Sequence, residues 1–387
     1  YGRQRAAMVA NVITYRARSV LQDVGKAFGL TQAQVNGLTK YLDTRRPSEI
    51  REHVDLPPGM TGDLILDACR RLDGFPRHLG IHSGGMVIAD RPLWEVVPLE
   101  WGRMEDRSVL QWDKDDCASM GIVKFDLLGL GMLNALHLTV DLIDEAHGVR
   151  LDLADLPQEP VVYDMLTRAD TVGVFQVESR AQMATLPKMK PKTFYDLAIE
   201  VALIRPGPIQ GQSVHPFLRR RNGEEPVAYP HPSAEPILRR TLGVPVFQEQ
   251  LMEIARVCAG FTPGQSDRLR QAMTHKRSDE EMEKLRAETY AGMAGNGITG
   301  AAADEIWEKL QAFAAFGFPE SHSDSFAYIV YASSWLKYHW PTEFLCGLLN
   351  AQPMGFYTPN SLVQDSLRHG VIVEGPDVNV SEYDCTV

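Results

Sequence analysis

Apolar residues recur at helical spacing through the first 42 residues and are interleaved with basic ones. This pattern predicts amphipathic helices over residues 1–42, with Gly29 as a helix stop. Residues 43–62 carry the prolines and glycines of a loop, and a further helix is expected from about Thr61 to Leu72. The apolar positions of the first segment are Met8, Val9, Val12, Ile13, Val20, Leu21, Val24 and Phe28.

The pattern changes near Gly80. Two short apolar runs bounded by glycines, "GIHSGGMVIAD" and "GIVKFDLLGL", predict strands. After Leu130 helical spacing dominates to about Asn350, interrupted by proline-rich loops at 187–191, 205–208 and 226–236. The chain is therefore expected to be α+β and mainly α: a small helical module, a short sheet and a long helical region.

Composition excludes several classes of protein. The 387 residues are 44% hydrophobic and 23% charged, which excludes a collagen, a disordered tail or a disulfide scaffold. A length of this order allows roughly two or three domains. The best apolar run, Phe326 to Leu336, is too short for a membrane helix. The five scattered cysteines lack metal-site spacing, so we expect reduced thiols of a cytosolic protein.

The start of the chain and its charge add two expectations. The sequence opens at Tyr1 without a signal-peptide pattern, so we expect a piece of a longer protein. A net charge of −11 argues mildly against a purely electrostatic nucleic-acid binder. The basic residues are nevertheless clustered, and the net charge of a chain does not show such clusters.

One strand candidate carries two charged residues. In "IVKFDLL", Lys124 and Asp126 share one face of the predicted strand, while Val123 and Phe125 share the other. Charged groups in an apolar run are costly to bury unless they are paired or serve a ligand. Three hypotheses stay open: a structural ion pair, a cap for a helix beginning at Leu127, and a metal or phosphate site.

A second candidate is a helix rich in cations. Thr262 and Pro263 suit the N-cap and first position of a helix whose apolar stripe is flanked by basic residues. This arrangement suits a polyphosphate or a nucleic-acid backbone. It is also typical of a solvated face, and the acidic run from Asp279 to Glu283 could neutralise it. The flanking residues are Arg268, Gln271 and His275 on one side and Arg270, Thr274 and Arg277 on the other.

Further basic residues stand in short clusters. Each is typical of surface decoration, and together they could line a groove. Arg205 precedes Pro206-Gly207-Pro208, which holds it on a stiff, non-helical segment suited to presenting a guanidinium, or simply to making a turn. The clusters are Lys188, Lys190 and Lys192; Arg219, Arg220 and Arg221; Arg239 and Arg240; and Arg45 and Arg46.

Two motif-like segments do not fit their usual chemistry. Gly295 to Gly300 matches GxGxxG but follows a charged helix and no strand, so it indicates a helix stop and restart. A dinucleotide-dependent enzyme is therefore disfavoured. Ser321-His322-Ser323-Asp324 contains the residue types of a hydrolase triad, but immediate neighbours cannot form the spaced array.

A series of motifs, in order, resembles the C-family DNA polymerases, the alpha subunits of bacterial DNA polymerase III. They include "HSGGMVIA", "DKDDCASMGIVKFDLLGL", "TVGVFQVESRAQM", "VALIRPGPIQ", "FTPGQSDRLRQAM" and "FGFPESHSDSFAYIVYASSWLKYHWPTEF". The segments "QPMGFYTPNSLVQDSLRHGV", "DVNVSEYD" and "FPESH" resemble the error-prone branch, which is associated with translesion synthesis and DNA repair. The resemblance covers essentially the whole chain.

The resemblance implies a division into domains. Residues 1–18 would end a first palm segment, 19–80 would be an inserted helical thumb, 81–129 would return to the palm, and 130–387 would form the helical fingers. The palm would be part of a polymerase-β-like nucleotidyltransferase sheet.

The resemblance also implies site residues. Asp126 would be a catalytic, metal-binding aspartate with Lys124 beside it as a second catalytic residue. Nucleotide and phosphate binding would fall to Arg205, Arg268, Arg270, His322 and His82. The clusters expected to bind DNA are Arg219, Arg220, Arg221, Lys188 and Lys190.

The family's other two metal-binding aspartates would lie upstream of the initial "YGR". Two-metal phosphoryl transfer needs carboxylates that hold two cations about 4 Å apart. We therefore expect two Mg²⁺ ions in the intact parent, at most a partial site here, and an inactive isolated chain. The alternative is a non-catalytic module that binds primer-template or a partner protein.

The implied partners are primer-template DNA and a dNTP. A sliding clamp and translesion accessory proteins would bind regions outside this chain. No membrane is expected, and the location would be the bacterial cytoplasm, at the nucleoid.

Overall fold

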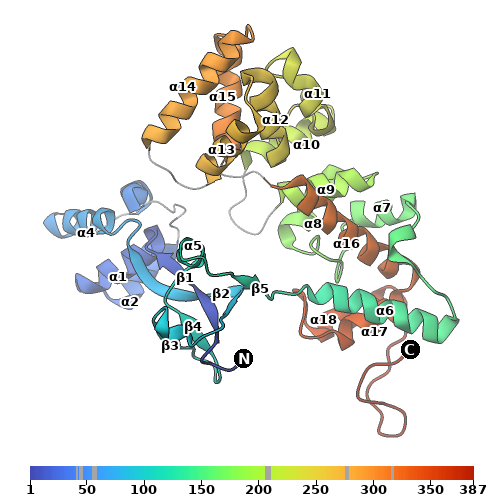
Figure 1. Ribbon diagram of the computed structural model, residues 1–387. Coiled ribbons are helices and arrows are strands. Elements are labelled where there is room, and N and C mark those ends of the chain that lie inside the picture. Colours follow the sequence, from blue (N-terminus) through green and yellow to red (C-terminus); the bar gives the residue numbers. More distant parts are fainter. Residues whose placement is uncertain (41, 43–46, 55–58, 205–210, 275–278, 315–317) are drawn as a thin grey trace. The chain divides into compact units, whose positions relative to one another are not determined.

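The computed structural model describes residues 1–40, 42, 47–54, 59–204, 211–274, 279–314 and 318–387. These residues form two compact units, Tyr1–Gly129 and Leu130–Val387 (Figure 1). The boundary falls at the residue where the palm was expected to give way to the fingers, while the palm, thumb and fingers assignments stay predictions. No helix in the described part of the chain is long and apolar enough to cross a membrane.

The first unit is built on a mixed five-stranded sheet with strand order β3-β4-β1-β2-β5. β1 pairs with β2 antiparallel and with β4 parallel, and β5 forms one edge beside β2. Ala7, Val9 and Val87 lie in an apolar cluster of this unit. The strands are β1 (Ala6–Thr14), β2 (Pro76–Ile88), β3 (Leu99–Trp101), β4 (Ser108–Leu110) and β5 (Phe125–Asp126).

The helical interpretation of the first residues is wrong for one stretch. Ala6–Thr14 is the central strand β1, and not a helix. Its β-branched Val9, Val12 and Ile13 suit a pleated strand, and β1 has a neighbour on each side, β2 and β4. The spacing of apolar residues alone could not distinguish the helical from the strand period in so short a run. The predicted strand over "GIVKFDLLGL" is also much shorter than expected, because only Phe125–Asp126 pairs.

The helices of the first unit agree better with the sequence. Val20, Leu21 and Val24 of α1 are buried in a second apolar cluster with Ile65 of α4. Gly29 follows the end of α1 with φ +86, the left-handed conformation that glycine adopts freely, which confirms the predicted stop. The helices are α1 (Ala17–Ala27), α2 (Gln32–Lys40), α3 (Ile50–His53), α4 (Met60–Arg71) and α5 (Lys114–Ser119).

The second unit is helical, as predicted. Helices α6, α9, α16 and α17 contribute to its largest apolar cluster, whereas α12 to α15 surround another (Figure 1). The helices are α6 (Gly131–His147), α7 (Pro160–Thr167), α8 (Arg180–Met189), α9 (Phe194–Leu203), α10 (Gly211–Arg221), α11 (Glu235–Leu238), α12 (Gln248–Ala259), α13 (Pro263–Thr274), α14 (Asp279–Gly295), α15 (Ala301–Ala314), α16 (Glu320–His339), α17 (Pro341–Asn350) and α18 (Pro359–Arg368).

Two local predictions for this unit are confirmed. Thr262 caps α13, since its Oγ1 accepts a hydrogen bond from Gln265 N at 3.3 Å while Gln265 Oε1 accepts from Thr262 N at 2.9 Å. Gly295 ends α14, and α15 begins at Ala301, so the GxGxxG segment is the expected helix stop and restart. Pro187, expected in a loop, lies inside α8.

Candidate active site at the sheet edge

The candidate site begins with a bulge in β2. Ile81 pairs with Ala10 and Met86 with Met8, so residues 82–85 stand opposite a single residue of β1. Such bulges re-aim side chains and are frequent beside active sites. His82 closes this one, because its Nδ1 accepts hydrogen bonds from the backbone N–H groups of Gly84 at 3.2 Å and Gly85 at 2.7 Å.

The bulge lies directly against β5. Gly85 pairs with Asp126, and Leu127 N donates to Gly84 O at 2.8 Å. A Cβ atom on Gly84 would overlap Asp126 Oδ1 and lie 2.6 Å from Leu128 Cβ. The glycine at this position therefore provides space for the Asp126 carboxylate and the backbone that follows it.

Lys124 and Asp126 form an ion pair, one of the three hypotheses left open by the sequence, with Nζ and Oδ2 3.7 Å apart. Asp126 Oδ1 accepts a hydrogen bond from Leu128 N at 3.1 Å, which makes an Asx turn. The helix-cap hypothesis is wrong, because the next helix, α6, begins at Gly131 and not at Leu127.

The apolar neighbours of Lys124 and Asp126 suggested that the pair would be buried, but its carboxylate is not. The Asp126 side chain is 57% exposed, and Val123 and Phe125 are exposed as well. A half-exposed carboxylate is a hard oxygen ligand of the kind that Mg²⁺ prefers. Among the described residues, no group of three metal-ligating side chains includes Asp126.

Comparison with known proteins finds a family model that matches the first unit and another that matches part of the second. Residues 1–129 match the model of the bacterial DNA polymerase III alpha NTPase domain, and residues 132–297 match that of the bacterial DNA polymerase III alpha subunit finger domain. The chain belongs to the bacterial DNA polymerase III alpha family.

Curated relatives of this polymerase family are similar over the whole chain. The chain is 59% identical to an error-prone DNA polymerase of Mycolicibacterium paratuberculosis over 98% of its length, and 59% identical to one of Nocardia farcinica over 100%. An error-prone DNA polymerase of Mycobacterium tuberculosis is 58% identical over 98% of this chain. The chain spans about a third of the length of these relatives.

The residues expected to meet nucleotide phosphates lie on separate elements. On α13, Arg268 pairs with Glu288 at 3.4 Å and Arg270 pairs with Asp267 at 2.8 Å. His322 lies on α16, where its ring contacts those of Phe318 and Phe326. No hydrogen bond or ion pair between described residues joins either arginine to His322. Arg205 lies outside the described residues, as do Arg45, Arg46, His275 and Arg277.

The structure does bring two basic clusters together. Asn222 Nδ2 donates to Lys188 O, and Arg221 Nη2 donates to Lys190 O, both at 3.1 Å, so the ends of α8 and α10 are joined. The side chains of Lys188 and Lys190 make no ion pair with a described carboxylate. Their role in DNA binding stays a prediction.

The three arginines beside them have intramolecular partners. Arg219 and Arg220 share Glu225, at 2.8 and 2.9 Å. Arg221 pairs with Asp196 at 2.6 Å. Burial acts to raise the pKa of Asp196, but Arg221 and two backbone N–H groups hold that pKa below its usual value. These arginines therefore already have carboxylate partners within the fold, and a role in DNA binding would have to be additional.

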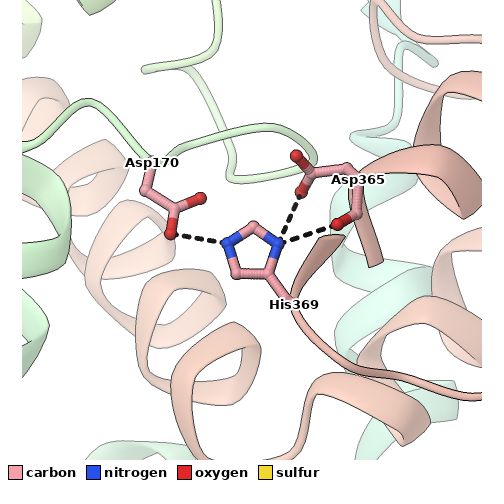
Figure 2. Close-up of side chains that lie close together, drawn as sticks. All are labelled: Asp170, Asp365 and His369. Carbon is pink, nitrogen blue, oxygen red and sulfur yellow. Dashed lines mark hydrogen bonds and ion pairs between the residues drawn. The ribbon is translucent and has the colours of Figure 1, made fainter. Parts of the chain in front are cut away.

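A second cluster of potential metal ligands was not predicted. Among the described residues, Asp170, Asp365 and His369 hold ligand atoms within 4.8 Å of one another (Figure 2). Lys337 Nζ lies 3.1 Å from Asp170 Oδ1 and 2.8 Å from Asp365 Oδ2, so an ammonium already neutralises the carboxylates. The arrangement fits a partly buried ion network better than a cation site.

Sequence reasoning also missed a buried acid. Glu200 of α9 is fully buried, and neither of its carboxylate oxygens has a hydrogen-bond partner among the described residues. Burial raises its pKa to about 8. Nothing local distinguishes Glu200, because it stands in an apolar run whose every residue becomes buried.

Proposed function

We propose that this chain is part of an error-prone DNA polymerase that adds dNTPs to a primer 3′-OH with release of pyrophosphate. The observation that carries the proposal is Asp126 of β5, paired with Lys124 just before the strand and lying against a glycine bulge. The unit that holds them matches the DNA polymerase III alpha model. The relatives' name, error-prone DNA polymerase, supports the same activity and a role in damage-tolerant synthesis and repair.

Asp126 is the residue proposed to hold metal. Its carboxylate is more than half exposed, and its Oδ2 is engaged only by Lys124 at 3.7 Å among the described contacts. Bound Mg²⁺ ions would supply positive charge to the primer hydroxyl and to the triphosphate. Lys124, which is mostly covered, holds its ammonium beside the carboxylate and would add positive charge for a phosphate.

The remaining assignments follow the family's architecture. We propose that residues 1–18 and 81–129 are palm, 19–80 thumb and 130–387 fingers. Arg268, Arg270 and His322, with Arg205, would neutralise the nucleotide phosphates. Lys188 and Lys190, with the neighbouring arginines, would contact the DNA backbone. The location consistent with this activity is the bacterial cytoplasm, at the nucleoid.

A second function, binding without catalysis, has one observation in its favour. Among the described residues, Asp126 belongs to no group of three metal-ligating side chains, and a site that holds two cations about 4 Å apart needs further ligands. We propose that residues 1–387 alone do not polymerise, and that the complete site needs other parts of the whole protein. Primer extension by the purified chain in Mg²⁺ would contradict this.

The test of the main proposal is Asp126→Asn in the whole polymerase. The amide is isosteric but loses the charge that holds a metal, so we expect primer extension to fall by at least about 100-fold while the protein stays folded. Asp73→Asn, an exposed aspartate in a turn of the same unit, is the matched control and should extend at the wild-type rate. Full activity of Asp126→Asn would overturn the assignment.

A further inference from the structure

One side chain, that of His82, binds the backbone that contacts Asp126. Residues 82–85 leave the ladder with β1, and backbone groups that leave a ladder need other partners. His82 Nδ1 supplies an acceptor for two of them, the N–H groups of Gly84 and Gly85. Gly84 and Gly85 are buried, whereas the His82 ring is half-buried at the start of the bulge.

The same two glycines touch the candidate catalytic pair. Gly84 O accepts from Leu127 N, and a Cβ on Gly84 would overlap Asp126 Oδ1. A Cβ on Gly85 would lie 2.9 Å from His82 Nδ1 and 3.1 Å from Lys124 Cδ. His82, the bulge, Lys124 and Asp126 are thus packed in one continuous series of contacts.

The hydrogen bonds of His82 determine which ring nitrogen carries the proton in the neutral side chain. An Nδ1 that accepts two N–H groups carries no proton, so a neutral ring carries its proton on Nε2. Sequence resemblance assigns His82 to nucleotide phosphate, which would use Nε2–H as a donor. The described hydrogen bonds use Nδ1 alone.

We propose that His82 is a positioning residue of the polymerase site: through Nδ1 it fixes the Gly84–Gly85 bulge, and the bulge fixes Asp126 and Lys124. This inference rests on the proposed function, because it takes Asp126 as the metal ligand. It differs from a phosphate contact, since it requires the acceptor at Nδ1 and does not require the donor at Nε2.

The test compares three substitutions in the whole polymerase by steady-state primer extension. In His82→Asn, Oδ1 replaces Nδ1 as the acceptor, so kcat should stay within about threefold of wild type. His82→Gln and His82→Ala lack an acceptor at that position, and kcat should fall about 10- to 100-fold, as for other residues that orient a metal ligand. KM for the dNTP should change little, because no substrate contact is lost.

The opposite pattern would overturn the inference. If Nε2 contacts phosphate, His82→Asn and His82→Ala raise KM for the dNTP alike, and His82→Gln partly restores it. Wild-type kcat for His82→Ala would also overturn it. His78→Ala, at an exposed histidine of β2 outside the bulge, is the control and should leave both constants unchanged.

A double-mutant cycle of His82→Ala and Gly85→Ala distinguishes loss of the bulge from general unfolding. A Cβ on Gly85 would lie 2.9 Å from His82 Nδ1, so Gly85→Ala displaces the ring from the bulge and should reduce kcat by a similar factor. Its effect and that of His82→Ala should not add, because both release the same bulge; additive losses would contradict the proposal. If His82→Ala fails to fold by circular dichroism, His82→Asn against His82→Gln still decides. Full activity of Asp126→Asn would contradict the proposed function, and not only the role of His82.

Discussion

At the scale of single residues, Gly84 shows that the site depends on space. Its φ is not in the left-handed region, so its backbone does not require glycine. The requirement comes from the close approach of Asp126 and Leu128. The motif "HSGG" marks the position in the sequence, but only the paired strands show what the missing side chain leaves room for.

Gly84→Ala should therefore reduce polymerase activity without a change in chemistry at any side chain. The added methyl group must displace Asp126 or the backbone at Leu128, and a misplacement of about 1 Å can cost about 100-fold in rate. Primer extension by the whole polymerase measures this. Gly37→Ala in α2, where a Cβ would meet nothing within 4 Å, is the matched control. A wild-type rate for Gly84→Ala would show that Asp126 tolerates displacement.

At the scale of elements, Lys337 links α16 to α18 and to the segment before α8. Its Nζ donates a hydrogen bond to Val172 O at 3.0 Å and also forms ion pairs with the carboxylates of Asp170 and Asp365. His369 completes the link, with Nε2 2.8 Å from Asp170 Oδ2 and Nδ1 2.8 Å from Asp365 O. Arg368 also pairs with Asp365, so three basic side chains share two carboxylates.

This network predicts a pH-dependent stability. Burial acts to lower the pKa of His369, but the Asp365 carbonyl and Asp170 carboxylate raise it above 6.5 overall. Burial likewise acts to raise the pKa of Asp170, yet Lys337 and His369 hold it below 3.8. Asp170 therefore stays charged while His369 titrates. The stabilisation from protonated His369 is complete below its unfolded pKa and is lost as pH rises through its folded pKa.

His369→Gln keeps a polar side chain that cannot become charged. The difference in unfolding free energy between the wild-type chain and this variant should be larger at about pH 5.5 than at about pH 8. It should stay below about 1 kcal/mol, because a third of the His369 side chain is exposed. Urea denaturation followed by circular dichroism measures the difference, with exposed His137→Gln on α6 as a comparison. A difference that grows with pH would contradict the assignment.

At the scale of the whole molecule, a net charge of −11 does not exclude exposed basic residues at one place, and Lys188 and Lys190 are such residues. Lys188 and Lys190 are exposed at the end of α8, where backbone hydrogen bonds join them to the end of α10. The nearby Arg219, Arg220 and Arg221 are already paired, so the two lysines are the better candidates for phosphate contacts.

Binding of a labelled primer-template, followed by anisotropy across a salt series, tests this surface. Each phosphate contact that is lost should reduce the slope of log affinity against log salt by about 0.9. Lys188→Gln with Lys190→Gln should therefore lower the slope by about 2, whereas Lys114→Gln on α5 should leave it unchanged. An unaltered slope for the double variant would place the DNA elsewhere. The whole polymerase is the appropriate protein for this measurement.

The sequence by itself determined the features that depend on near neighbours. The α+β composition, the helix near Thr61 to Leu72, the cap at Thr262 and the turn at Gly295 to Gly300 each follow from residues within a few positions of one another. The motif "VKFD" likewise placed Lys124 and Asp126 on one face of an extended segment and so allowed an ion pair between them, which the structure contains.

Only the tertiary structure decided the features that depend on distant partners. β1 is a strand because β2 and β4 pair with it, and His82 reaches Asp126 only through a bulge that the sheet register creates. Lys337 pairs with Asp170 and with Asp365, which are 167 and 28 residues away from it in the sequence. Arg221 finds Asp196 in the same manner. Local sequence constrains backbone conformation over a few residues, whereas these contacts form only when separate elements pack together.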